Sequence, residues 1–538
     1  MDIFDSFPEA RNPHWRRENL YMILDESGKL IPLQMRQEQR AFITARHHRN
    51  IVPKARKLGM STIIVIDYLD ACLFNEHTFC AHIDRTKGDA EAKLAIARFA
   101  WENGHQHPNE RSRELWAEYK KTIRLTTDNA GELAWSHGSM QRAAVSFTGR
   151  TPQRLHVSEY GPIAAQEPAR AAEIKRGSIN SVPKDGTIDI ETTMEGGPFG
   201  PCYDIFIQGE ENAGLESLSP VQWKLHFFPW YNHPSYRLLG RKPEKEKTIE
   251  YFASLQRHHH LEIPLECQAW YEQTWATQRE NMWSQFPSTP AECIKVPAQG
   301  RIYEHIAMLR TDGHVKEFAH ERSSPIMTGW DLGVSDFTSG WAVQFAGRDV
   351  LWLAWWEGEG KGAADVVSVI RGWEAQFGQR MVMNLFPHDA AYRDKGTARS
   401  YREILVDAGL PNPSLHIVPR TPDIWLGINA VRDLLPMSWF HARCDTPRFD
   451  DSGSAMPSGV ACLEHYRKRP DTSSGILSEV PVHDRTSHTA DAARTIAEAW
   501  KQGLLGRHLT HGPNAPRRDA FGDLIKPSKQ SVARFMGI

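Results

Sequence analysis

Apolar and polar positions in the first third of the chain alternate between short runs and long helical periods. Residues 49–53 form a short apolar run, and residues 61–75 carry a helical pattern. A second apolar run at 78–84 precedes a long Ala-rich helix at 87–103. Further predicted strands lie at residues 121–127, 133–137, 143–148, 154–159 and 187–193. Strands that alternate with helices favour a parallel sheet with helices on both faces.

The pattern changes after residue 228. Residues 229–324 are rich in Trp, Glu and Arg and are interrupted by prolines, which predicts a helical subdomain and linker. Three adjacent strand-like runs follow at 326–332, 339–345 and 350–356. After them we expect helices at 363–377, 397–409, 424–435 and 489–500 and strands at 381–387 and 414–418. Three hairpin-connected strands followed by strand and helix units are typical of a ribonuclease-H-like domain. The predicted domains are therefore 1–228, 229–324 and 325–505, with a tail at 506–538.

Composition narrows the classes of protein. The 538 residues correspond to three or four domains at roughly 150 residues each. The 64 Lys and Arg against 66 Asp and Glu give a net charge of -2, so nucleic acid would have to bind at local basic patches. Residues 501–538 hold seven Lys or Arg and two Asp, which predicts a basic tail. The seven cysteines form no C-x-x-C pair, and no apolar run approaches the roughly 20 residues of a membrane span. We expect a soluble, unsecreted protein with reduced thiols.

A candidate phosphate-binding loop joins the first predicted strand to the first helix. The standard pattern is G-x-x-x-x-G-K-[ST]. In this chain Lys54 occupies the position of the first glycine of the pattern, and Met60 occupies the position of its lysine. A loop in this place points backbone N–H groups and the helix N-terminus at phosphates, and either Lys54 or Arg56 supplies the cation. The nucleotide-binding candidates are Lys54, Ala55, Arg56, Lys57, Leu58, Gly59, Met60, Ser61 and Thr62. Ser61 is also the candidate magnesium ligand, and a basic turn capped by Ser61 is the alternative.

Two later strands end in residues that suit ATP hydrolysis. The run 155–159 ends in Ser158 and Glu159, where a Walker B motif usually has Asp and Glu. In that scheme Glu159 orients or activates water, while Ser158 helps to hold the metal directly or through water. The strand 187–193 ends in Thr192 and Thr193, whose hydroxyls suit a γ-phosphate sensor. The alternative for Glu159 is a surface glutamate at a strand end.

A second candidate site lies in the last domain. Two-metal hydrolysis needs several carboxylates that converge from distant segments. Asp331 lies on the first strand, Asp389 ends the 381–387 strand, and Asp491 lies between two alanines on the last helix. We predict that these three hold two Mg²⁺ or Mn²⁺ ions, although each alone is more typical of a turn or a cap. Further candidates are Asp336, Asp484, His388 and His488.

The order of these motifs resembles that of the large terminase subunit of tailed bacteriophages, the motor that packages viral DNA. The resemblance covers most of residues 30–500. It implies an α/β protein with an N-terminal P-loop ATPase domain of the ASCE type, a helical subdomain and a C-terminal ribonuclease-H-like nuclease domain. It also implies that Thr192 and Thr193 form a coupling motif.

The same resemblance implies roles for two further kinds of side chain. A glutamine upstream of the loop reads adenine, and Gln37 is the candidate, with Gln34 and Gln39 fitting nearly as well. An arginine completes the site of a neighbouring subunit, and Arg150 is the candidate, with Arg142 as the alternative.

The function implied by the resemblance is ATP hydrolysis with Mg²⁺ to move double-stranded DNA into a procapsid, and cutting of concatemeric DNA by a two-metal endonuclease. The expected partners are double-stranded DNA, the portal protein of the procapsid, the small terminase subunit and further copies of the chain, as a pentameric ring on the portal. The expected place is the host cytoplasm and, transiently, the portal vertex. A helicase-like or repair ATPase fused to a nuclease, which would need further helicase motifs, and a non-catalytic capsid-assembly protein remain as alternatives.

Overall fold

The computed structural model is an α/β protein with two compact units, Met1–Pro297 and Ala298–Ile538. It describes residues 3–147, 149–195, 197, 200–295, 300–333, 337–392, 399–446, 448–449, 455–470 and 477–506. Asp336 and nearly all of the predicted basic tail lie outside these residues. None of the described helices is both long and apolar enough to cross a membrane.

The sheet of the first unit has a parallel centre and an antiparallel edge. Its strands run in the order β10 (Lys224–Leu225), β3 (Arg49–Pro53), β9 (Thr187–Thr192), β8 (Arg154–Ser158), β4 (Phe79–Ile83), β7 (Met140–Ala144), β6 (Glu132–Trp135) and β5 (Leu125–Asn129). All pairs from β10 to β7 are parallel, as the sequence predicts, whereas β7, β6 and β5 pair antiparallel. The connections between β5, β6 and β7 are too short for the crossover that parallel strands need.

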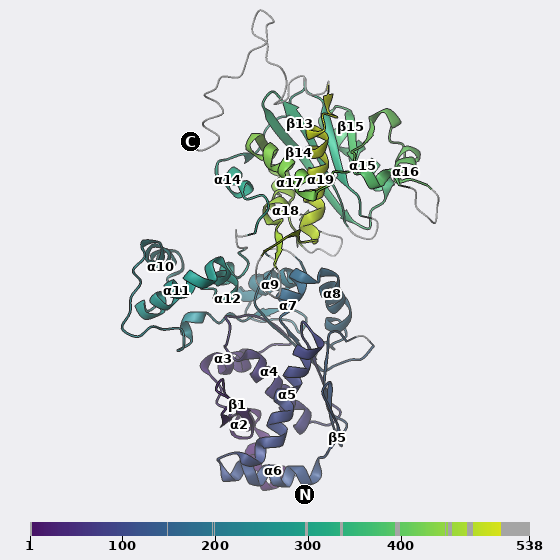
Figure 1. Cartoon of the computed structure of the whole chain (residues 1–538). Helices are drawn as coiled ribbons and strands as arrows, with labels where there is room; N and C mark the ends of the chain where they lie inside the picture. Colours follow the sequence, from purple (N-terminus) through teal and green to yellow (C-terminus); the bar gives the residue numbers. More distant parts are fainter. Residues whose placement is uncertain are drawn as a thin grey trace, which may run out of the picture. The chain divides into compact units, whose positions relative to one another are not determined.

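Helices of the first unit form two apolar cores with this sheet. Successive residues of a strand point to opposite faces, and Ile51 and Val52 of β3 accordingly belong to different cores. The core of Val52 includes α4 (Met60–Phe74) and α5 (Lys87–Asn103), which lie side by side (Figure 1). The core of Ile51 includes α7 (Tyr160–Gln166) and α9 (Pro201–Glu211). The remaining elements before residue 230 are α1 (Ile3–Ser6), α2 (Pro13–Asn19), β1 (Met22–Leu24), β2 (Leu30–Pro32), α3 (Gln37–Ala45), α6 (Glu110–Thr122) and α8 (Pro168–Glu173).

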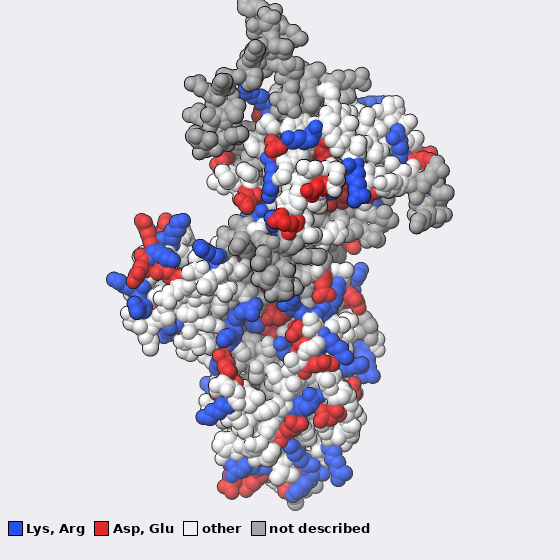
Figure 2. Space-filling view, in the orientation of Figure 1, with Lys and Arg blue, Asp and Glu red and all other residues white. Residues whose placement is uncertain are grey.

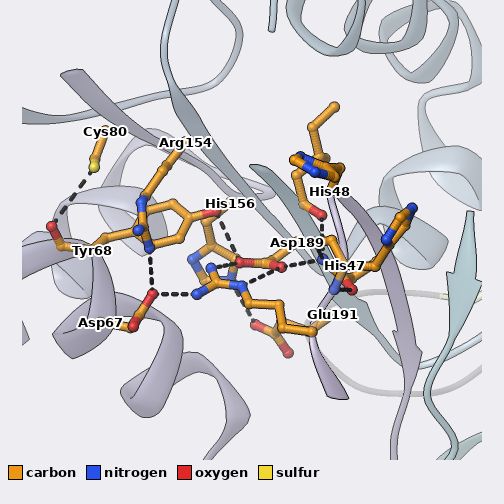
Figure 3. A network of polar contacts seen from close by, with 12 residues as sticks. His47, His48, Asp67, Tyr68, Cys80, Arg154, His156, Asp189 and Glu191 are labelled. Atoms are coloured by element: carbon orange, nitrogen blue, oxygen red, sulfur yellow. Dashed lines mark hydrogen bonds and ion pairs between the residues drawn. The ribbon is translucent and has the colours of Figure 1, made fainter. Parts of the chain in front are cut away.

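Helix α4 is almost wholly buried and yet contains two buried aspartates, Asp67 and Asp70. Burial raises the pKa of Asp67, but the arginines around it outweigh burial and hold the pKa well below its usual value. The groups that donate to the two carboxylates are Arg16, Arg17, Tyr21, Arg46 and Arg154. Figure 3 shows the contact between Arg154 and Asp67. An unpaired buried carboxylate would be strongly destabilising, so these ion pairs hold α4 against the N-terminal segment and the sheet.

The helical region after residue 229 belongs to the first unit. It contains α10 (Glu246–His259), α11 (Leu265–Gln278), α12 (Met282–Gln285) and α13 (Pro290–Cys293). Trp230, Tyr236 and Trp270 join the core that contains α4, with the Tyr236 and Trp270 ring centroids 4.6 Å apart. Ile302 and Tyr303, by contrast, lie in a core of the second unit. The second unit therefore includes part of the 229–324 segment, because these apolar side chains pack against its helices.

The sheet of the second unit contains the three predicted hairpin-connected strands at its centre. Its strands run in the order β11 (Val315–Lys316), β17 (Ser438–His441), β14 (Asp349–Glu359), β13 (Phe337–Ala346), β12 (Ile326–Asp331), β15 (Met381–Phe386) and β16 (Leu415–Ile417). Strands β12, β13 and β14 pair antiparallel, and β15 and β16 add in parallel beside β12. The sequence did not predict β17, which is only four residues long and too short to show a period.

Helices of the second unit pack on both faces of its sheet as two further cores. One core includes α14 (His305–Thr311), α17 (Ile424–Leu434), α18 (Gly459–His465) and α19 (Arg485–Lys501), and the other includes α15 (Ala363–Phe377) and α16 (Tyr401–Asp407). Helix α19 begins four residues before the predicted position at 489, because Asp484 caps it by accepting from the Thr486 N–H.

Helix α19 packs directly onto β12 at Gly329. A Cβ at this position would lie 2.2 Å from Ile496 Cγ1 and 3.1 Å from the Ala492 carbonyl oxygen. Glycine is therefore required here by the close approach of helix and strand. The contact fixes α19, which carries Asp491, against β12, which carries Asp331.

We expect Gly329→Ala to lower the free energy of unfolding by about 1–3 kcal/mol, because the methyl group overpacks this contact. Thermal melting of the full chain measures the change. Gly372→Ala is the matched control, since no described atom lies within 4 Å of a Cβ at that position in α15; this variant should melt no lower than the wild type. Equal melting temperatures for Gly329→Ala and the wild type would contradict the packing argument.

Candidate functional site

The loop between β3 and α4, where the sequence predicts a phosphate-binding site, contains two left-handed residues. Lys57 and Gly59 have positive φ angles of 61° and 70°, and α4 begins directly afterwards at Met60. The positive end of the α4 dipole and its first N–H groups therefore lie at the loop, which favours an anion. A Cβ at Gly59 would lie 2.6 Å from Gln39 Nε2, the movable end of a side chain, so it is the φ of 70° that favours glycine at this position.

The structure distinguishes the three candidate glutamines. Gln39 is buried, and its Nε2 donates to the Gly59 carbonyl oxygen at 2.8 Å. Gln37 begins α3, and both Gln37 and Gln34 are exposed. Gln39 therefore contacts the loop itself, while its two neighbours leave their amides in solvent.

The two candidate cations of the loop, Lys54 and Arg56, have different surroundings. Met60, which stands where the usual lysine belongs, is 1% exposed and packs in the core with Ala55 and Leu58. The Arg56 side chain donates to Gln285 of α12. Lys54 is buried, with Nζ 2.9 Å from Glu191 Oε2 and 3.4 Å from Glu159 Oε1. Of the two cations that the sequence offers, Lys54 is therefore the one at the carboxylates.

Glu159 lies at the carboxyl end of β8 and is held by Thr193. Its Oε2 accepts from the Thr193 N–H at 3.2 Å and from the Thr193 hydroxyl at 3.0 Å. The hydroxyl of Thr192 accepts from the Gly161 N–H at 2.7 Å. Glu159 has a φ of 54°, a left-handed conformation that is unfavourable for a residue with a side chain. This strained turn and Thr193 fix the carboxylate next to Lys54.

The sequence reading assigned no role to Glu191, although this side chain is central to the site. Glu191 is fully buried, and its Oε1 accepts from the Ser61 hydroxyl at 2.7 Å. His156 Nε2 lies 3.4 Å from the same oxygen (Figure 3). Burial raises the pKa of Glu191, but Lys54 and His156 outweigh burial and lower it. The signal was present in the sequence, because an acidic side chain within a buried strand needs a partner.

The same charges act on Lys54. Burial lowers the pKa of Lys54, but the carboxylates of Glu191 and Glu159 outweigh burial and raise it above its usual value. Lys54 and Glu191 are therefore both charged near neutral pH. Such a cluster suits phosphates and a divalent cation, since the lysine can face an anion and the carboxylates a cation.

The two candidate trans arginines lie away from this cluster. Arg150 is exposed, and its Nη1 lies 3.7 Å from Met140 Sδ. Arg142 on β7 lies 3.7 Å from Glu132 Oε2 of β6.

Thr62, the last of the nucleotide-binding candidates, follows Ser61 in the first turn of α4 and is half-buried.

In the second unit the structure brings Asp331 and Asp491 together. His488 Nδ1 of α19 lies 3.0 Å from Asp331 Oδ2, and Asp491 is one helical turn after His488. Arg494 Nη1 lies 3.1 Å from Asp491 Oδ1. Burial raises the pKa of Asp491 to about 7; Arg494 opposes the shift and Asp331 adds to it. A cation between these two carboxylates would relieve their repulsion.

The third predicted ligand, Asp389, lies on the same edge of the sheet but does not complete a cluster. It follows β15, which runs parallel to β12, and its side chain is exposed. Among the described residues, no three His, Cys, Asp or Glu side chains form a group that could hold a metal ion. The three-aspartate metal site therefore stays a prediction.

The other candidates in this unit have structural contacts. Asp484 caps α19 and lies 3.2 Å from Arg467. His388 packs near Tyr392, with ring centroids 5.8 Å apart. Glu357 of β14, which the sequence reading did not consider, is buried and accepts from Arg485 at 2.8 Å. These ion pairs and caps hold the start of α19 in place.

No protein-family model and no curated protein matches the sequence. Among solved structures, the chain is similar to the large terminase of bacteriophage HK97, with 13% identity over 91% of this chain and 99% of that chain and a TM-score of 0.47. It is also similar to a large terminase from a thermophilic bacteriophage in complex with ATP-γ-S (14% identity, 86% and 98% covered, TM-score 0.28). A third is the magnesium-bound large terminase nuclease from thermophilic phage G20c (11% identity, 37% and 98% covered, TM-score 0.25). These proteins are of the class that the sequence motifs resemble.

We expect Lys54→Ala to weaken ATP binding about tenfold or more, because a buried charge-assisted contact is lost. Arg56→Ala should have a smaller effect, since the Arg56 side chain is held by Gln285. Lys87→Ala, at a lysine outside the loop whose side chain is 76% exposed, is the control. Equilibrium binding of a fluorescent ATP analogue measures all three, and a stronger effect of Arg56→Ala would transfer the role to that arginine.

We expect the second unit to lose stability as pH rises toward 7 without divalent cations. The pKa of Asp491 rises from its ordinary 3.8 to about 7 on folding, so between these values the unfolded chain releases this proton first. The difference in melting temperature between Asp491→Asn and the wild type should therefore grow from pH 4 to 7 and then level off.

Asp433→Asn is the control for this titration, because Asp433 is a half-exposed carboxylate that pairs with Lys501. This variant should show no such trend. Added Mg²⁺ or Mn²⁺ should shrink the effect of Asp491→Asn at pH 7. A difference that does not vary with pH would contradict the raised pKa.

Proposed function

We propose that this chain is the motor and nuclease subunit of a viral DNA-packaging machine. The observation that carries the proposal is the convergence of Lys54, Ser61, Glu159 and Thr193 at the carboxyl ends of three adjacent parallel strands. This edge of an α/β sheet is where ligands bind. The separate unit with Asp331 beside Asp491 supplies the second activity.

In the first unit the side chains divide the work of ATP hydrolysis. Bound Mg²⁺ would neutralise charge on the β- and γ-phosphates. Lys54 faces the phosphates with a permanent positive charge, and the loop and the N-terminus of α4 direct N–H groups toward them. Glu159 orients the attacking water and accepts its proton. Thr193 holds that carboxylate, so movement of β9 on loss of the γ-phosphate passes to the rest of the unit.

In the second unit Asp331, Asp491 and Asp389 would hold two Mg²⁺ or Mn²⁺ ions, which would activate water and neutralise the scissile phosphate. His488 positions Asp331, and Arg494 positions Asp491. Lys and Arg are interspersed with Asp and Glu on the visible face of the molecule (Figure 2). Double-stranded DNA therefore binds through local basic patches rather than through a field of one sign.

The proposal extends to assembly. Arg150, exposed on the loop before β8, completes the ATP site of a neighbouring copy, which implies head-to-tail contacts of the kind that close into a ring. On this view a pentamer docks on the portal protein of the procapsid, the small terminase subunit delivers the DNA, and the chain works in the host cytoplasm and at the portal vertex.

One pair of variants tests the proposal. Glu159→Gln keeps the shape of the side chain but not its basicity, so ATP hydrolysis should fall by roughly 10²–10⁴-fold while nucleotide binding persists. Asp331→Asn should abolish metal-dependent cleavage of plasmid DNA. Each variant is the control for the other, because each should retain the activity of the unaffected unit.

Several outcomes would contradict the proposal. If Glu159→Gln hydrolyses ATP as fast as the wild type, Glu159 is not the catalytic carboxylate. If DNA cleavage persists in EDTA, the nuclease does not use metal ions. A wild-type protein that neither hydrolyses ATP nor cuts DNA with Mg²⁺ present would support the non-catalytic assembly protein.

A further inference from the structure

One carboxylate that ATP hydrolysis by a P-loop protein normally requires is missing from its usual strand. Such proteins hold Mg²⁺ with the loop Ser or Thr and with a Walker B Asp. In this chain Ser158 occupies the place of that Asp at the end of β8. The Ser158 hydroxyl is buried and has no hydrogen-bond partner among the described residues. Strand β8 thus offers Glu159 for the water but no carboxylate for the ion.

The neighbouring strand supplies a carboxylate on the same face. Glu191 of β9 is the in-register partner of Ser158 in the parallel ladder. Partners in register on adjacent strands have side chains on one face of the sheet. The Glu191 side chain also reaches the hydroxyl of Ser61 at 2.7 Å, and Ser61 is the loop residue expected at the ion.

We propose that Glu191 replaces the missing β8 carboxylate and, with Ser61, forms the magnesium-binding pair of the ATPase site. The inference rests on the proposed ATPase function and deepens it. Glu191 accepts from the Ser61 hydroxyl and pairs with Lys54. The phosphates of ATP would give Lys54 a further anionic partner beside Glu191 and Glu159, and a divalent cation would compensate the negative charge of the buried Glu191.

The contact with Ser61 argues against a purely structural role. Both partners of Glu191, the Lys54 ammonium and the Ser61 hydroxyl, belong to the candidate phosphate-binding segment, and Lys54 has a second carboxylate near it, Glu159 at 3.4 Å. Asp189, two residues earlier on β9, shows what a structural carboxylate in this strand looks like. It pairs with Arg46 and accepts from Asn50 and Tyr68 (Figure 3). Glu191 is the carboxylate of the strand that faces the loop.

The experiment measures how strongly Mg²⁺ affects nucleotide binding to the full chain. The dissociation constant of mant-ATP is determined once with Mg²⁺ and once with EDTA. The constant in EDTA divided by the constant in Mg²⁺ measures the contribution of the ion to binding. We expect Glu191→Gln to lower this ratio roughly tenfold or more, since loss of a group that serves a metal typically weakens metal affinity 10–100-fold. The dissociation constant in EDTA should change much less, whereas a merely structural role would alter both constants alike.

Two further variants sharpen the result. Asp204→Asn is the matched control. Asp204 of α9 is another carboxylate that pairs with a lysine, since Lys175 Nζ lies 2.9 Å from its Oδ2. This variant should keep the wild-type ratio. Ser158→Asp combined with Glu191→Gln returns a carboxylate to β8 and should restore the ratio. Thermal melting confirms that each variant is folded.

The outcomes separate the inference from the proposed function. Absence of mant-ATP binding by the wild type in both buffers would overturn the ATPase proposal itself. Binding with an unchanged ratio in Glu191→Gln would overturn only the role of Glu191. If Glu191→Gln does not fold, Ser158→Ala provides the test. If this variant loses the whole effect of Mg²⁺ on the dissociation constant, Ser158 of β8 holds the ion and the role of Glu191 is overturned. A smaller loss supports Glu191.

Discussion

Burial of charge at the carboxyl ends of parallel strands is the constraint on which the rest of the first unit depends. Strand β9 lies between β3 and β8, so Lys54 and Glu191 meet in an interior where neither charge is stable alone, with the half-buried Glu159 beside them. The two carboxylates raise the pKa of Lys54, and Lys54 lowers that of Glu191. These contacts hold the loop, the strand ends and the start of α4 in one arrangement.

The same rule organises the other end of the sheet. Asp189 on β9 and Asp67 on α4 share Arg46, so a single strand carries a structural carboxylate and, two residues later, one that faces the loop. Removal of one partner from such a network leaves an uncompensated charge. The polar residues inside this unit are thus as restrictive as its apolar core, and they link the N-terminal segment to the site.

The second unit handles its carboxylates in a different way. Burial raises the pKa of Asp491 to about 7; Arg494 and His488 oppose the shift, and repulsion by Asp331 adds to it. Whereas the first unit neutralises its acids with its own cations, the second keeps an acid partly protonated. Close packing at Gly329 maintains this unfavourable proximity, because it fixes α19 against β12.

The sequence alone determined the order and type of most elements, because the 3.6- and 2-residue periods are local properties. It also located Lys54, Glu159, Thr193, Asp331 and Asp491, since each stands at the end of an apolar run or beside small residues. It did not determine whether Lys54 or Arg56 faces the carboxylates, nor that Gln39 rather than Gln37 contacts the loop, nor that Glu191 bonds to Ser61. Those outcomes depend on which strand lies beside which and on the packing of Met60 and Gln285, and such contacts between distant residues arise only when the tertiary structure forms.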